Sequence, residues 1–135
     1  MSGTAHEENV YDALTESDDP RWAFGSGFED AEADIVAPVP GGTDPADLAA
    51  YCLMLGDDAL IYSHRLTEWV SNAPELEEEV ALANTALDLL GQARVLLSRA
   101  GHVEGLAEGG TGRDEDALAH GREVHEVRNG ALAEP

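Results

Sequence analysis

The stretch DPADLAAYCLMLGDDALIYSHRLTEWVSNAPELEEEVALANTALDLLGQARVLLSRAGH, residues 44–102, decides the fold of this chain. Asp44 can cap the free N–H groups of a helix, and Pro45 fits the first helical turn without losing a hydrogen bond. The apolar residues that follow recur at helical spacing, so we predict a helix over residues 45–72. The residues on its apolar face are Leu48, Tyr51, Cys52, Leu55, Ala59, Tyr62, Leu66, Trp69 and Val70.

Pro74 starts a second helical segment, predicted over residues 74–100. Four glutamates follow it, where the positive end of the helix dipole favours acids, and Gly101 is a natural terminator. A connection of one or two residues forces the two helices to run antiparallel, each about 40 Å long at ~1.5 Å per residue. The sequence therefore predicts a long helical hairpin.

The flanking segments have weaker patterns. Residues 1–43 are predicted to form an acidic, extended arm that docks Trp22, Phe24 and Phe28 on a neighbouring surface or is disordered; an aromatic platform for a substrate is the alternative. Residues 103–112 are predicted to be a glycine-rich linker, and residues 113–135 a short third helix and tail. The fold class is thus all-α, a fragment of a helical bundle built on one hairpin.

The charge of the chain restricts its partners. The formal net charge is −21, with 28 acids against seven arginines and no lysine. Binding to nucleic acid or to an anionic membrane requires cations that this chain lacks. The composition instead suits concentrated salt, which reduces the range of self-repulsion to about 3 Å at 1 M. We therefore expect a halophilic source.

The single cysteine and the apolar runs indicate a cytoplasmic protein. Cys52 lies within the apolar face of the first helix, so we predict a small buried hydrophobe rather than a nucleophile, and no intramolecular disulfide can form. No apolar run approaches the ~20 residues that cross a bilayer, and the acidic N-terminus lacks the cationic start of a signal peptide. We expect no membrane association.

Both helices are apolar on more than one side, which predicts partner helices. Leu53, Met54, Leu60 and Ile61 lie outside the main apolar arc of the first helix. Two helices cannot bury each other on every side, so the hairpin is expected to need further helices from another chain.

Antiparallel helices with inward carboxylates are also the frame of di-iron proteins, which require a Glu-x-x-His motif. This motif is absent from the chain. Folding the chain about Ala73 predicts that Asp57 or Asp58 faces residues 88–92, which makes Asp58 the candidate first-helix ligand. Arg94 lies on the apolar arc and is predicted to pair with Asp58, to pair with an acid of a partner, or to extend its guanidinium to the edge of the helix.

The phrases SHRLTEW, APELEEE and ALDLLGQAR resemble the first hairpin of the ferritin-like C subunits of phenylacetyl-CoA ring epoxidases, and RDEDALAHGREVHEVRN is similar to their next segment. The related catalytic A subunits carry Asp-Glu-x-Gly-His in the matching helix, which supplies two iron ligands. This chain has Asp88-Leu89-Leu90-Gly91-Gln92 in that frame. The degenerate metal-site positions are therefore Asp58, Leu89 and Gln92, because leucine has no lone pair and an amide is a poor iron ligand.

The resemblance implies a non-catalytic subunit that stabilises the iron-bearing A subunit of a phenylacetyl-CoA monooxygenase. It implies no cofactor in this chain, a di-iron centre in the partner, and contact with phenylacetyl-CoA only through that partner. Trp69 and Arg94 are candidate partner contacts. Because the family subunits are considerably longer, the chain is expected to be either a truncated copy or a short form that assembles with other chains.

Two alternatives remain open at the level of sequence. One is a remnant or generic helical interaction module with no part in the oxygenase. The other is a self-assembled iron protein with Asp57, Asp58 and Asp88 as ligands.

Overall fold

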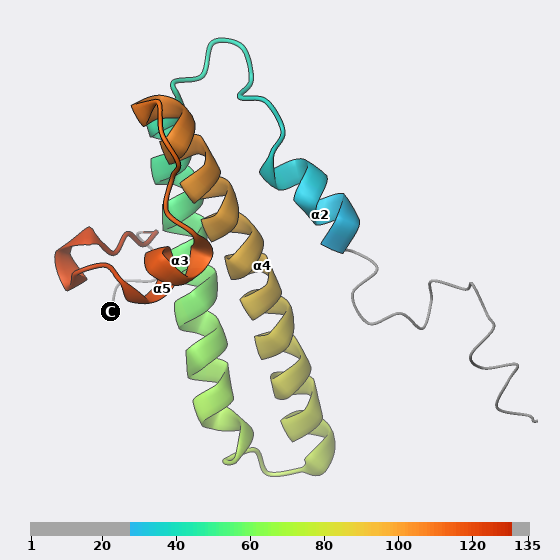
Figure 1. The fold of residues 1–135 in the computed structure, drawn as a ribbon. Coiled ribbons are helices and arrows are strands. Elements are labelled where there is room, and N and C mark those ends of the chain that lie inside the picture. The colour runs from blue at the N-terminus through green and yellow to red at the C-terminus, as the bar shows by residue number, and fades with distance from the viewer. Residues whose placement is uncertain (1–27, 131–135) are drawn as a thin grey trace, which may run out of the picture.

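The computed structural model describes residues 28–130, with side chains from residue 32 onward. This part of the chain is helical and contains no strand. Its elements are α2 (Phe28–Ile35), α3 (Pro45–Val70), α4 (Leu76–Glu108), α5 (Glu115–His120) and the 3-10 turn η2 (Val124–Glu126). Figure 1 shows α3 and α4 lying side by side as one long antiparallel hairpin, which confirms the predicted fold class.

The start of the hairpin follows from local chemistry. The Asp44 side chain accepts a hydrogen bond of 2.8 Å from the Ala46 N–H, and Pro45 is the first residue of α3. Acidic residues fill the first turn of α4, where the helix dipole favours them. The turn between the helices spans residues 71–75, so it is longer than the predicted one or two residues.

Gly101 does not end the second helix as predicted, because α4 continues to Glu108 and is capped by Gly109 in the left-handed conformation (φ 70°). Gly101 is buried, and a Cβ there would lie 1.8 Å from the Arg113 carbonyl oxygen. Its role is to let the returning loop approach the helix backbone closely. The predicted linker at residues 103–112 is accordingly reduced to the loop at 109–114.

The predicted third helix is only partly formed. Asp114 caps α5 by accepting from the Ala117 N–H at 2.8 Å, and α5 ends before Gly121. Leu118 of α5 is fully buried in one cluster with Cys52, Leu53, Leu97 and Ala100 of the hairpin. α5 lies partway along the hairpin, where Arg94 of α4 contacts Glu115 of α5, and not at the C-terminal end of α4 (Figure 1). Cys52 is buried as predicted, and burial raises the pKa of its thiol although Arg99 opposes this.

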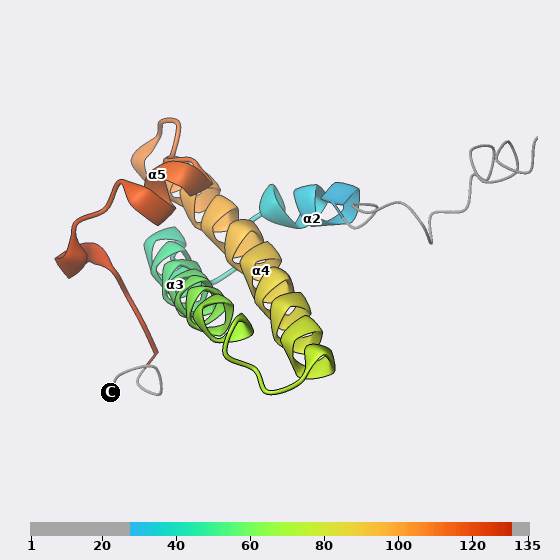
Figure 2. The same cartoon turned by 90° about the horizontal axis from the view of Figure 1, so that it is seen from below.

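The end of the predicted acidic arm is not fully extended, since residues 28–35 form α2. Arg99 of α4 donates hydrogen bonds to the carbonyl oxygens of Ile35, Ala37 and Pro38, which fixes the chain after α2 against α4. In both views α2 lies on the side of α4 away from α3 (Figures 1 and 2). Trp22 and Phe24, predicted to dock on a neighbour, lie outside the described residues, as does the side chain of Phe28.

The hairpin leaves many large apolar side chains in solvent. Trp69 is 64% exposed and Leu87 is 65% exposed, and these are residues that a completed bundle would cover. By length and composition alone α4 could also cross a membrane, a test that helices of bundle interiors pass too. The described elements therefore leave a large part of the apolar surface of the hairpin exposed.

Candidate functional site at the carboxylates of α3

The carboxylates of Asp57 and Asp58 bind the C-terminal segment rather than residues 88–92 of α4, and the hairpin is offset from the predicted register. Ser63 Oγ donates to the Ala86 carbonyl oxygen at 2.8 Å, and a Cβ on Gly56 would lie 3.1 Å from Leu97 Cγ. These two contacts place Asp57 level with a part of α4 that lies roughly one to two helical turns beyond the predicted one. The turn at residues 71–75 is centred on Ala73, as predicted, so the offset comes from how the two helices pack against each other and not from the position of the turn.

Asp57 binds an arginine of the C-terminal segment. Its side chain is 2% exposed, and the guanidinium of Arg122, whose side chain is 3% exposed, donates to both carboxylate oxygens. The Arg128 N–H adds a third hydrogen bond of 2.7 Å to Asp57 Oδ2. Arg122 also donates to the carbonyl oxygens of Leu118 and Glu126. A bidentate pair with additional bonds is the arrangement that compensates the cost of burying two charges.

Asp58 binds the same C-terminal segment two residues beyond Arg128, at Gly130. Both of its oxygens accept from the Gly130 N–H, at 3.0 and 2.9 Å. The two carboxylates that sequence reasoning proposed as metal ligands therefore fasten residues 122–130 to α3. We name this segment, residues 122–130, the strap.

The α4 residues of the predicted degenerate site differ in burial. Leu89 is half-buried on α4, whereas Asp88 and Gln92 are exposed. Within residues 28–130 no group of three His, Cys, Asp or Glu side chains could hold a metal ion. The donors do not fit a di-iron centre, because the α3 carboxylates already bind N–H groups and α4 offers an aliphatic chain and an amide.

Arg94 and Trp69, the candidate partner contacts, lie apart from these carboxylates. Arg94 Nε donates to Glu115 Oε1 of α5 at 3.3 Å. Arg94 therefore pairs with an acid of its own chain, but this acid is Glu115 instead of the predicted Asp58. The pKa of Glu115 is lowered, first by a hydrogen bond from its own backbone N–H and then by Arg94. Trp69 is exposed near the end of α3, close to the turn.

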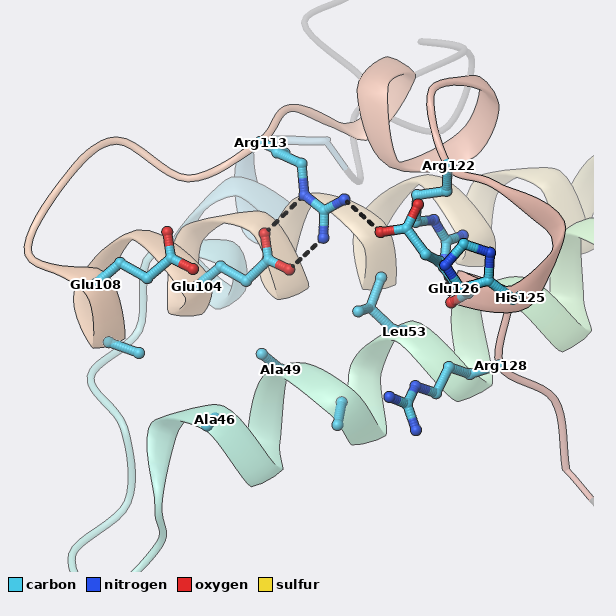
Figure 3. A pocket seen from close by; sticks show the side chains of 12 residues that line it. Ala46, Ala49, Leu53, Glu104, Glu108, Arg113, Arg122, His125, Glu126 and Arg128 are labelled. Atoms are coloured by element: carbon cyan, nitrogen blue, oxygen red, sulfur yellow. Dashed lines mark hydrogen bonds and ion pairs between the residues drawn. The ribbon is translucent and has the colours of Figure 1, made fainter.

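A pocket of about 450 Å³ lies between the start of α3, the end of α4 and the strap (Figure 3). Arg113 crosses it and donates to Glu104 Oε1 at 2.6 Å and to Oε2 at 3.1 Å. This hydrogen-bonded pair raises the pKa of Arg113. Glu126 Oε1 lies 3.9 Å from Arg113, so the polar groups of the pocket mainly pair with one another.

Sequence reasoning missed Arg113 and Arg122. Two signals for Arg122 were available in the sequence. The chain has only seven arginines to pair with 28 acids, and Arg122 lies four residues after the apolar Leu118, on the same side of a helix. The identity of its partner acid required the register of the hairpin.

Taken together, the described elements define an all-α, ferritin-like helical hairpin with a buried carboxylate–arginine pair that binds its C-terminal segment. The chain belongs to the phenylacetic acid catabolic protein family, whose model matches residues 40–135. It is 52% identical over 87 residues to the C subunit of 1,2-phenylacetyl-CoA epoxidase from Escherichia coli (strain K12), and this match covers 64% of the present chain. The chain spans 33% of the length of that curated relative.

Proposed function

We propose that this chain is a non-catalytic structural subunit of a multicomponent phenylacetyl-CoA monooxygenase in aerobic phenylacetate degradation. Its role is to stabilise an iron-bearing catalytic A subunit through contacts between helices. The observation that carries the proposal is the use of Asp57 and Asp58 to bind the strap, where an iron protein of this fold would place a ligand. The replacement of the α4 ligands by Leu89 and Gln92 supports the same conclusion.

The exposed apolar surface of the hairpin supports a helical partner. Trp69, Leu76 and Leu87 are each more than 60% exposed on the two long helices. Because large exposed apolar side chains are costly in water, a stable assembly covers them. Contact with phenylacetyl-CoA is proposed to occur only through the partner, and the di-iron centre is proposed to belong to the partner.

The proposed setting is the cytoplasm of a halophile. A formal charge of −21 is compatible with a protein partner at high salt and unfavourable for nucleic acid and anionic membranes. Assembly with the A subunit is therefore proposed to strengthen as the salt concentration rises.

The proposal is tested by purifying the chain alone and together with the A subunit from the same organism. We expect less than about 0.1 iron per chain for the chain alone, because its candidate ligands are occupied or apolar. We expect a stable complex in molar KCl, with more soluble and more active A subunit than without the chain. Stoichiometric iron in the isolated chain, with colour on adding peroxide, would contradict the non-catalytic role. Failure of the two chains to co-purify would favour a generic helical module.

A further inference from the structure

The strap ends in the dipeptide Asn129-Gly130, whose two reactive groups lie beside a carboxylate of α3. Both oxygens of Asp58 accept from the Gly130 N–H, at 3.0 and 2.9 Å. Asn129 is half-buried and lines a surface pocket with Tyr51 and Met54, so water has access to it. The side-chain amide of an asparagine and the backbone nitrogen of the next residue are the two groups that react in deamidation.

The contact with Asp58 requires glycine at residue 130. A Cβ there would lie 2.8 Å from Asp58 Oδ2, so any other residue would push the carboxylate away from the backbone N–H. The missing side chain also removes the main steric obstacle to attack by the Gly130 nitrogen on the preceding asparagine. The way in which α3 binds the strap therefore places the most reactive neighbour after Asn129.

Deamidation at this dipeptide needs only water as a co-reactant. The Gly130 nitrogen loses its proton and attacks Cγ of Asn129. A bond forms between these two atoms, the bond from Cγ to the amide nitrogen breaks, and ammonia leaves with the proton from Gly130. Water then opens the resulting succinimide ring at either carbonyl, which leaves aspartate or isoaspartate at residue 129.

The Asp58 carboxylate opposes the first step of this reaction in two ways. Its negative charge lies against the N–H and disfavours loss of the proton, because the nitrogen anion would face a carboxylate. The hydrogen bond also holds Gly130 against α3, so its nitrogen must leave Asp58 before it can approach Cγ of Asn129. The reaction therefore proceeds from strap that has opened locally.

We infer that Asn129-Gly130 is a deamidation site, that Asp58 protects it while the strap is bound to α3, and that deamidation releases the end of the strap irreversibly. The isoaspartate product lengthens the main chain before Gly130, which moves the N–H away from Asp58. Both products add a carboxylate beside Asp58, and like charges at short range repel each other. The displacement by isoaspartate is geometric, so salt does not screen it.

The test incubates the full wild-type chain in molar KCl at mildly alkaline pH, folded and unfolded in urea, and follows Asn129 by peptide mass spectrometry. Asp58→Ala is compared with Asp88→Ala, which removes the same charge from an exposed position of α4. Because Asp58→Ala removes a hydrogen bond to a charged group, we expect it to deamidate Asn129 at least about tenfold faster than wild type. Asp88→Ala should match wild type.

The release of the strap is measured on the products. Ion exchange separates the deamidated wild-type chain from the unreacted chain of the same sample, and amide hydrogen exchange compares Gly130 in the two fractions. We expect the Gly130 N–H to exchange faster in the fraction with isoaspartate at residue 129. Circular dichroism shows whether each variant is folded, and the comparison of folded with unfolded wild type does not depend on a variant.

Each part of the inference has its own contrary result. Absence of aspartate and isoaspartate at residue 129 in the unfolded chain would overturn the site. Equal rates for folded and unfolded wild type, equal acceleration in both variants, or slower reaction in Asp58→Ala would overturn protection by Asp58. Unchanged exchange of the Gly130 N–H after deamidation would overturn the release of the strap.

Discussion

The buried pair between Asp57 and Arg122 gives the sharpest test of the site. Replacing Asp57 by Asn keeps the volume of the side chain and removes its charge. Arg122, with a side chain 3% exposed, would then be buried without a carboxylate. Breaking a buried pair on one side costs roughly 3–5 kcal/mol, so we expect Asp57→Asn to lose about 3 kcal/mol of unfolding free energy, reduced by the remaining bonds of Arg122 to carbonyl oxygens.

The matched control is Arg65→Gln, which breaks the pair between Arg65 and Glu68. Those side chains are 70% and 64% exposed, so the expected loss is about 0.5 kcal/mol or less. The double variant Asp57→Asn with Arg122→Gln should lose less than the sum of its two single variants, because it leaves no buried charge unpaired.

The assay is urea unfolding followed by circular dichroism in molar KCl, together with amide hydrogen exchange of the strap. The Arg128 and Gly130 N–H groups are direct reporters, since they donate to Asp57 and Asp58. We expect the Arg128 N–H to exchange faster in Asp57→Asn, while the turn of the hairpin is unchanged. A loss no larger than that of Arg65→Gln, with Arg128 still protected, would refute the assignment of Asp57 as the anchor of the strap.

Three further predictions concern close packing, acid and salt. Gly101→Ala should lower the free energy of unfolding by roughly 1–3 kcal/mol, because its Cβ would meet the Arg113 carbonyl oxygen. Gly91→Ala, with open space around it, should raise the free energy of unfolding by roughly 0.5–1 kcal/mol, and thermal unfolding compares the two variants. The pKa of Glu126 is lowered below its usual 4.5, mainly by the Glu123 N–H and then by Arg113. The ionised carboxylate therefore stabilises the folded state fully above pH 4.5, and this stabilisation is lost as the pH falls through the lowered pKa. Glu126→Gln should therefore flatten the fall in melting temperature between about pH 5 and pH 3, and an unchanged slope would contradict this. The melting temperature of the wild-type chain should rise by about 10 °C between dilute and molar KCl, and a flat response would remove the halophilic interpretation.

Much of the fold was predictable because its signals are local. Asp44 and Pro45 start α3, and the apolar spacing on both sides of Pro74 produces two long helices that must turn back on each other. The apolar Leu89 and the amide Gln92, on which the proposal of a non-catalytic role draws, were also readable from the residues alone. The burial of Cys52 followed from its position within an apolar face.

The errors arose where spatial neighbours override a local signal. Gly101 carries the sequence signature of a helix end, but α4 continues through it to Glu108, and the missing side chain instead leaves room for the Arg113 carbonyl oxygen. Residues 28–35 were predicted as part of an extended arm and form α2, whose following carbonyl groups bind Arg99 from a distant part of the chain. Neither contact is visible within a short window of sequence.

The sequence by itself determined two amphipathic helices and their antiparallel course, because helix periodicity and caps are properties of neighbouring residues. Only the tertiary structure decided which groups Asp57 and Asp58 bind and where α5 packs on the hairpin. The physical reason is register: a shift of one residue along α4 changes the facing side chain by ~100° around the helix, and the shift is set by how the two helices pack and not by the turn, which is centred on Ala73 as predicted.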